Sequence, residues 1–117
     1  MSKVTILHNP RCSKSRQTLA LLEDKGITAE VIEYLKEPLT AEQLTVLKFK
    51  LGLDSFLAMM RTKEAEFAEA GLSKTTSTEE QLLDAIVQYP KLLERPVVIT
   101  EQAARIGRPP EQVLDLF

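Results

Sequence analysis

A strand, a tight loop and a helix start follow one another at the beginning of this chain, and this order most constrains its fold. The segment over residues 3–8 is short and rich in β-branched side chains, which favours a strand. Asn9-Pro10 comes next and is typical of a turn. Ser13 or Ser15 is positioned to cap a helix that begins near Arg16. The sequence therefore predicts that the loop between strand and helix is short.

A second strand is expected soon after this helix. Gly26, preceded by Lys25, is a typical helix end. Residues 29–34 then alternate in side-chain character, and Pro38 ends the extended stretch. Such a β-α-β unit has a right-handed crossover, so we expect its two strands to be parallel.

Helices are predicted to dominate the middle of the chain, before two last strands. Thr40 and Gln43 have the spacing of a capping box for a helix with leucines at helical spacing that ends at Gly52. Further helical segments are expected over residues 54–60, 63–70 and 78–89, the last with a buried face of Leu82, Leu83, Ile86 and Val87. A strand over 96–100, a hairpin partner over 104–107 and a helix starting at Pro109-Pro110 complete the order.

These segments predict a single α/β domain over residues 1–117, ordered β-α-β, helices, β-β-α, with a helical insertion at about 40–90. The length of 117 residues suits one domain, and 44% hydrophobic residues suffice for one core. No apolar run approaches the roughly 18 residues that span a bilayer, so we expect no membrane insertion. No internal repeat or linker is visible.

The formal charge is unevenly distributed. A net charge of −2 provides no general basic field for nucleic acid or anionic lipid, so neither partner is expected. However, no acidic residue precedes Glu23, whereas Lys3, Arg11, Lys14 and Arg16 do. An acid-poor, Arg-containing start is also a feature of organellar transit peptides, but those are amphipathic helices and this segment is predicted as a strand. The positive charge is thus concentrated around one loop.

Cys12 is the only cysteine, and it lies within that cationic loop. A single thiol excludes an internal disulfide and any metal site built from several thiolates, and no metal is expected. It fits a reducing, cytoplasmic location. At a helix start, free N–H groups and flanking cations stabilise a thiolate, which is the nucleophilic form. The alternative is a buried structural cysteine, since free cysteines are often buried.

Two nucleophile templates are excluded by counting. A CxxC redox pair fails because Ser15 occupies the second cysteine position. A phosphatase-type loop fails because the sixth residue after Cys12 is Thr18 and not Arg. A monothiol C-x-x-S remains, which can attack an electrophile or exchange with a small thiol.

Other candidate residues lie near this loop or further along the chain. His8, the only histidine, could pair with the thiolate or simply pack at the strand end. Arg95-Pro96 precedes a short apolar strand, a place where a cis-proline can shape a thiol site. Guanidinium groups bind tetrahedral oxyanions through paired donors, although each arginine could equally be a solvated surface residue. The arginines in question are Arg61, Arg95, Arg105 and Arg108.

Three motifs together resemble one known family. HNPRCSKSR over residues 8–16, ERPVV over 94–98 and RIGRPPE over 105–111 resemble the ArsC family of glutaredoxin-linked arsenate reductases, and most closely its short bacterial branch. The similarity covers nearly the whole chain. It implies a thioredoxin-like fold with a mixed central sheet and an inserted helical subdomain.

The resemblance also implies roles for individual residues. Cys12 matches the catalytic nucleophile, and His8, Ser15 and Arg16 match activating or supporting positions of its loop. Pro96 matches the family's cis-proline. The three arginines that bind the oxyanion and its covalent intermediates correspond to Arg61, Arg95 and Arg108.

Electron counting adds a constraint on the mechanism. Reducing arsenate to arsenite takes two electrons, which two thiols supply when they form a disulfide, and this chain has one. The resemblance implies glutathione as cosubstrate and glutaredoxin as the partner that removes it, with no bound cofactor. We expect the protein to act as a monomer.

Two other functions fit the same residues. One is a glutathione-linked thiol transferase that acts on organic or protein disulfides. The other is a regulatory protein similar to the Spx-type regulators, which bind RNA polymerase and sense redox state. Those sensors typically use a CxxC switch, and Ser15 removes it here.

Overall fold

The computed structural model describes residues 4–74 and 76–117. It divides into two compact units, the first formed by residues 1–37 and 95–117 and the second by residues 38–94. Lys3, part of the first predicted strand, lies outside the described residues. The prediction of one domain with a helical insertion stays a prediction, and each unit is described by itself below.

The first unit is a four-stranded mixed sheet in the order β2-β1-β3-β4. Its strands are β1 (Thr5–Leu7), β2 (Glu30–Ile32), β3 (Val97–Ile99) and β4 (Ala104–Ile106). β1 pairs with β2 in parallel and with β3 antiparallel, and β3 pairs antiparallel with β4. The parallel β-α-β unit, the final hairpin and the mixed sheet are therefore as predicted.

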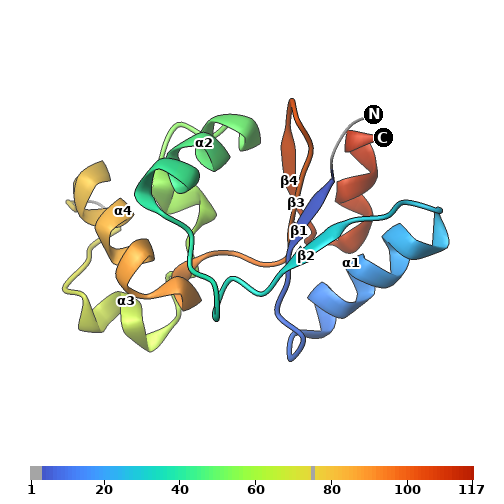
Figure 1. Ribbon diagram of the computed structural model, residues 1–117. Helices are drawn as coiled ribbons and strands as arrows, with labels where there is room; N and C mark the ends of the chain where they lie inside the picture. The colour runs from blue at the N-terminus through green and yellow to red at the C-terminus, as the bar shows by residue number, and fades with distance from the viewer. Residues whose placement is uncertain (1–3, 75) are drawn as a thin grey trace. The chain divides into compact units, whose positions relative to one another are not determined.

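Two helices of the first unit pack against each other and against its sheet (Figure 1). They are α1 (Ser13–Asp24) and the 3₁₀ helix η3 (Pro110–Leu116). Between them and the sheet lies a core cluster of Val4, Ile6, Leu22, Val98 and Val113. This core holds the end of β1 and the start of α1 in place, and the loop that carries Cys12 joins them.

The helix start differs from the prediction in one respect. α1 begins at Ser13, three residues before Arg16, and its N-cap is Cys12, which makes no side-chain cap bond. Neither Ser13 nor Ser15 is the cap. Ser15 instead lies in the first turn, fully buried, where its hydroxyl bonds to another part of the chain. At the other end, Gly26 adopts a φ of 75° just past the helix, as its position predicted.

The second unit is helical. It contains α2 (Ala41–Leu51), the 3₁₀ helices η1 (Phe56–Met59) and η2 (Pro90–Leu92), α3 (Ala65–Glu69) and α4 (Glu79–Gln88). The capping boxes of Thr40 with Gln43 and of Thr78 with Gln81 are both formed. In α4, Leu82 and Ile86 are buried as predicted, but Val87 is exposed because it lies on the other side of the helix.

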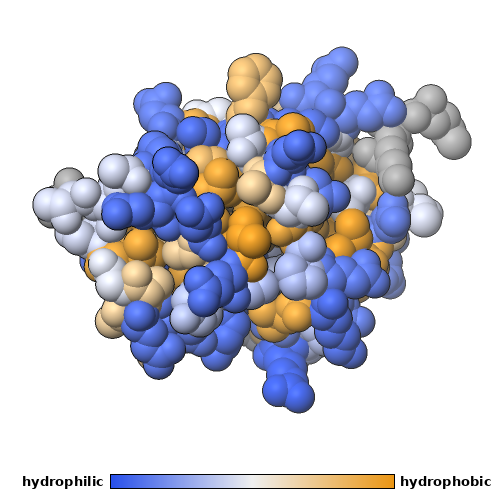
Figure 2. Space-filling view, turned by 60° about the vertical axis from the view of Figure 1, so that its left-hand side comes forward, coloured by the Kyte–Doolittle hydropathy of each residue, from blue (hydrophilic) through white to orange (hydrophobic). Residues whose placement is uncertain are grey.

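Hydrophilic side chains cover much of the face that Figure 2 shows, and smaller groups of hydrophobic ones lie among them. Within residues 4–74 and 76–117, every helix is too short or too polar to cross a membrane.

A cationic thiol site at the start of the first long helix

The loop after β1 places Cys12 at the N-terminus of α1. The loop is closed by Asn9, whose carbonyl accepts from the backbone N–H of Cys12 at 2.9 Å and whose Oδ1 accepts from that of Arg11 at 3.0 Å. The carbonyl of Cys12 in turn accepts from the N–H of Arg16 at 3.0 Å. Because the N-cap residue precedes the unpaired N–H groups of the first turn, this geometry directs donors toward the thiol.

The surroundings of Cys12 favour its thiolate. Partial burial raises the pKa of the thiol, but the backbone N–H of Ser15, the Arg95 guanidinium and the backbone N–H of Lys14 lower it more. The net effect is a pKa below the ordinary 9.0. The sulfur is only partly buried, so the thiolate is also accessible. Position and charge therefore both favour a reactive cysteine over a structural one.

Two arginines from the other end of the sequence lie beside this thiol. Arg108, which follows β4, has its Nη2 3.7 Å from the Cys12 Sγ, and its Nε donates to the carbonyl of Arg95 at 2.8 Å. Arg95 precedes β3, and its buried Nε has no hydrogen-bond partner among the described residues. A buried, unpaired N–H on a cation is suited to donate a hydrogen bond to an anionic oxygen.

His8 and Ser15 form a buried pair behind the loop. The His8 Nδ1 and the Ser15 Oγ are 2.7 Å apart, and Ser15 Oγ accepts from the backbone N–H of Asn9 at 3.0 Å. The Ser15 hydroxyl already accepts this hydrogen bond, so its own proton can be donated to the His8 Nδ1. That donation requires an Nδ1 that carries no hydrogen. Burial lowers the pKa of His8, Glu33 opposes this, and Arg16 adds to it, with a net shift downward. A neutral His8 that accepts from Ser15 fits both observations.

Arg16 and Pro96 complete the set of predicted residues in the first unit. Arg16 is exposed, and its Nη1 donates to the carbonyl of Pro10 at 2.9 Å, so it braces the loop. The Arg95-Pro96 peptide bond is cis. Pro96 itself is buried, and its carbonyl accepts from the N–H of Gly107 at 2.9 Å.

Comparison with known proteins identifies the family. The model of the ArsC family matches residues 7–116. The chain belongs to the ArsC family. It is 49% identical over 114 residues to the uncharacterized protein YfgD of Escherichia coli strain K12, covering 97% of this chain and 96% of that protein. It is 46% identical over 113 residues to an arsenate reductase of Neisseria meningitidis serogroup A, covering 97% of each chain.

A solved structure agrees with these sequence matches. The structure described as arsenate reductase from Vibrio cholerae is 48% identical to this ArsC-family chain, with a TM-score of 0.94 over 98% of each chain. The predicted thioredoxin-like fold with its mixed sheet is thereby confirmed.

The third predicted arginine of this ArsC-family protein, Arg61, belongs to the second unit. There its Nε pairs with the Glu64 carboxylate at 3.0 Å, and its backbone N–H donates to the carbonyl of Leu92. The first unit thus brings together Cys12, Arg95 and Arg108, and the role of Arg61 in oxyanion binding stays a prediction. Arg105, the other arginine considered, donates to the carbonyl of Ala104.

Two residues that the sequence analysis did not assign to the site support it. Asn9 closes the loop through both its carbonyl and its side chain, and the Asn-Pro pair was the available signal for such a turn. Gly107 allows the end of β4 to approach α1, since an added Cβ would lie 2.7 Å from the Thr18 Oγ1. A Gly before Arg108 gave no indication of that contact.

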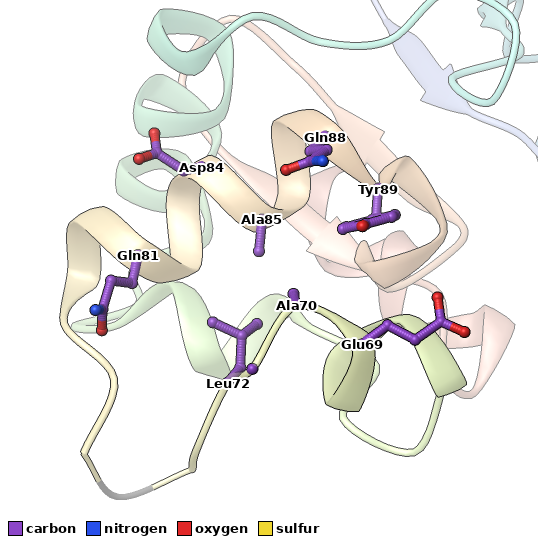
Figure 3. Close-up of a pocket in the computed structure, with 9 residues that line it drawn as sticks. Glu69, Ala70, Leu72, Gln81, Asp84, Ala85, Gln88 and Tyr89 are labelled. Atoms are coloured by element: carbon purple, nitrogen blue, oxygen red, sulfur yellow. The ribbon is translucent and has the colours of Figure 1, made fainter.

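The second unit holds a cavity of about 420 Å³ that none of the predicted site residues lines. Leu72, Ala70 and Ala85 lie at its centre, with Glu69 and Gln81 toward its two sides (Figure 3). Across residues 4–74 and 76–117, no three His, Cys, Asp or Glu side chains come together in a way that could hold a metal ion.

Proposed function

We propose that this protein is an arsenate reductase that uses glutathione and glutaredoxin as electron donors. The observation that carries the proposal is the position of the only thiol, Cys12, between helix N–H groups and the guanidinium groups of Arg95 and Arg108. The relatives named arsenate reductase support the substrate. The reducing interior of a cell, where a lone thiol stays reduced, is the location that suits this chemistry.

In this proposal the arginines hold the oxyanion while the thiolate attacks. The buried Arg95 Nε donates to one arsenate oxygen, and Arg108, braced by its bond to the Arg95 carbonyl, donates to another. Arg61 is the third arginine that the family resemblance implies, and its role in binding the oxyanion is part of this proposal. Negative charge develops on the arsenate oxygens as the As–S bond forms. Donors that already point at these oxygens stabilise this charge without having to reorganise, and they thereby lower the barrier.

The reaction balances with two external thiols. The Cys12 thiolate forms a bond to As(V), and one arsenate oxygen leaves as water. Glutathione displaces a second oxygen as water, forming an As–S bond to its sulfur. A glutaredoxin thiol attacks this sulfur, so the electron pair of the As–S bond reduces arsenic to As(III) and a mixed disulfide leaves. Water then hydrolyses the Cys12–As(III) bond and releases arsenite and the thiol. The overall change converts two thiols into one disulfide with net release of one water.

The direct test is arsenite formation by the purified protein. Complete mixtures with arsenate, glutathione, glutaredoxin and a system that recycles them are compared with mixtures lacking one component. We expect arsenite only when all are present, and none with Cys12→Ser. Wild-type activity equal to that of Cys12→Ser would refute the proposal. Full activity without glutaredoxin would refute the electron-transfer route but not the reductase assignment.

A glutathione-linked thiol transferase is the second candidate. It is favoured by the partly exposed Cys12 with its lowered pKa, which suits exchange with a mixed disulfide and needs no oxyanion. Glutathionylated peptide and arsenate are therefore assayed side by side. Turnover of the peptide that is insensitive to changes at Arg95 and Arg108, with no turnover of arsenate, would favour this candidate.

A further inference from the structure

The backbone of Arg61 is fixed by a short antiparallel bridge inside the second unit. Met60 pairs with Leu93 in this bridge, and both side chains are buried. Next to this pair, the N–H of Arg61 donates to the carbonyl of Leu92 at 2.6 Å. Since hydrogen bonds in buried surroundings are costly to lose, the backbone of Arg61 has a defined place in this unit. Its long side chain needs a separate contact to be held.

A nearby carboxylate supplies that contact. Glu64 lies three residues after Arg61, and its N–H donates to the Arg61 carbonyl at 3.2 Å. The Glu64 Oε1 accepts from the Arg61 Nε at 3.0 Å. Glu64 is also the N-cap residue of α3, but its side chain makes no cap bond to that helix. The carboxylate is therefore engaged with the guanidinium instead of with the N–H groups of its own helix.

The pairing determines which donors of Arg61 are left for a ligand. Within residues 4–74 and 76–117, the hydrogen-bond acceptor of the Arg61 side chain is Glu64, and it engages Nε. The edge formed by the two Nη groups stays available, and such an edge can bind a tetrahedral oxyanion through paired hydrogen bonds. The Arg61 and Glu64 side chains are 25% and 21% exposed, so a ligand from solvent can still reach the pair.

We propose that Glu64 is a positioning residue that orients the Arg61 guanidinium for the oxyanion. The inference rests on the proposed function for the ligand and adds the residue that sets the orientation. The negative charge of Glu64 has an effect of opposite sign, because it repels an anion. We expect orientation to prevail, since an arginine that is not already held loses side-chain freedom on binding, which weakens binding roughly 2- to 10-fold.

Sulfate measures oxyanion binding separately from arsenite formation. A bound oxyanion shields Cys12, so sulfate should slow the alkylation of this thiol by iodoacetamide, and the midpoint concentration of the protection reports affinity. Potassium chloride keeps the ionic strength constant across the titration, so that screening does not change. Absence of saturable protection in the wild-type protein would overturn the inference.

Two substitutions of Glu64 separate orientation from charge. Glu64→Gln and Glu64→Ala remove the same negative charge, but only glutamine keeps a side-chain oxygen that can accept from the Arg61 Nε. We expect the sulfate midpoint to rise at least about threefold in Glu64→Ala and to stay at or below the wild-type value in Glu64→Gln. Equal results for the two variants, whether a rise, a fall or no change, would contradict a role in orientation and overturn the inference.

Glu66 provides a matched control. Its Oε2 lies 3.7 Å from the Lys91 Nζ, and its side chain is 20% exposed, close to the value for Glu64. Glu66→Ala therefore removes a carboxylate and an ion pair of α3 but leaves the contact with Arg61 in place. We expect its sulfate midpoint to change less than about 1.5-fold. A rise as large as that in Glu64→Ala would assign the effect to general damage around α3, and it would overturn the inference.

A double-mutant cycle tests whether Glu64 acts through Arg61. Arg61→Gln alone should raise the sulfate midpoint, because the guanidinium is lost. In that background Glu64→Ala should cause no further rise, since the group that it orients is absent. An unchanged midpoint in Arg61→Gln would overturn the inference, and so would a further threefold rise in the double variant.

Arsenate kinetics keep this inference distinct from the proposed function. In the complete reductase mixture, Glu64→Ala should raise the KM for arsenate by about the same factor as the sulfate midpoint and change kcat less. If arsenite forms and this KM is unchanged, the positioning role fails and the proposed function stands. If the sulfate results are as expected but no arsenite forms, the proposed function fails and the positioning role stands.

Discussion

The Arg108 Nη2 lies 3.7 Å from the Cys12 Sγ, although 96 residues separate the two in the sequence. The sheet explains this approach. Cys12 follows β1, Arg108 follows β4, and β3 joins the two strands by antiparallel pairing. The Arg108 Nε is held by the Arg95 carbonyl just before β3. The site therefore combines residues from three places in the sheet: Cys12 after β1, Arg95 before β3 and Arg108 after β4.

The pH dependence of alkylation tests the environment of Cys12. The lowered pKa predicts that the rate with iodoacetamide reaches half its maximum below pH 9.0 in the wild-type protein. Arg95→Gln removes a hydrogen bond and a positive charge from the thiolate, so its midpoint should be higher. Lys63→Gln, in the second unit, is the control. An unchanged midpoint in Arg95→Gln would contradict the role of that guanidinium.

The geometry of Arg108 can be separated from its charge. Arg108→Lys keeps a cation but loses the fork that bonds to both the Arg95 carbonyl and the Cys12 sulfur. We expect kcat/KM for arsenate to fall by about 10- to 100-fold, corresponding to roughly 1.4–2.8 kcal/mol. The alkylation midpoint should move little. Arg105→Lys, on β4, is the matched control, and an equal fall there would argue against a specific role for Arg108.

Ser15 links the loop to His8, and its removal should mainly destabilise the fold. Ser15→Ala deprives two partners of a hydrogen bond, the buried His8 Nδ1 and the part-buried Asn9 N–H. We expect a loss of about 1–3 kcal/mol in the free energy of unfolding, measured with urea. The alkylation midpoint should shift less than in Arg95→Gln, because the Ser15 backbone N–H remains. Ser13→Ala, exposed in the same turn, should change stability by less than about 0.5 kcal/mol.

Local signals allowed the sequence to predict much of this fold. The capping boxes of Thr40 and Thr78 were correctly predicted because their partners lie three residues away. The β-α-β unit and the final hairpin could be predicted from side-chain pattern and turn residues. Ser15 was misjudged as a cap because its hydroxyl bonds to His8, seven residues earlier in the strand segment. Helix-cap propensity carries no information on such a tertiary partner.

The site was predictable in part for the same reason. The position of Cys12 at a helix start is a local property, so the residues around it were enough to predict it. Which arginine meets the sulfur depends on how β3 and β4 pair, so spacing alone could not distinguish Arg105 from Arg108. The family resemblance made that distinction, and in the structure Arg105 bonds to Ala104 while Arg108 contacts Cys12.

His8 should make stability depend on pH in a known direction. Its pKa is lowered in the folded protein, chiefly by burial, from the ordinary 6.5. Between these two values the unfolded chain binds more protons, so the free energy of unfolding falls as the pH drops from about 6.5 through the lower pKa. Urea midpoints across this range measure the effect. His8 is the only histidine, so His8→Gln should reduce the slope, and an unchanged slope would assign it to carboxylates.

Gly107 lets β4 approach α1, and filling its position should separate the elements that carry Arg108 and Cys12. A Cβ there would lie 2.7 Å from the Thr18 Oγ1 and 2.9 Å from the Pro96 Cγ. Gly107→Ala should therefore cost about 1–3 kcal/mol of unfolding free energy. Thr18→Ala removes one of the two obstacles together with its bond to the Lys14 carbonyl.

The double variant distinguishes crowding from other causes. Gly107→Ala combined with Thr18→Ala should be more stable than the sum of the single losses predicts, by about 0.5 kcal/mol or more. Recovery should stay incomplete because the Pro96 contact remains. The same double variant should regain part of the arsenate turnover lost in Gly107→Ala, since Arg108 follows directly in the chain. Strict additivity in urea unfolding would mean that Thr18 does not limit the approach of β4.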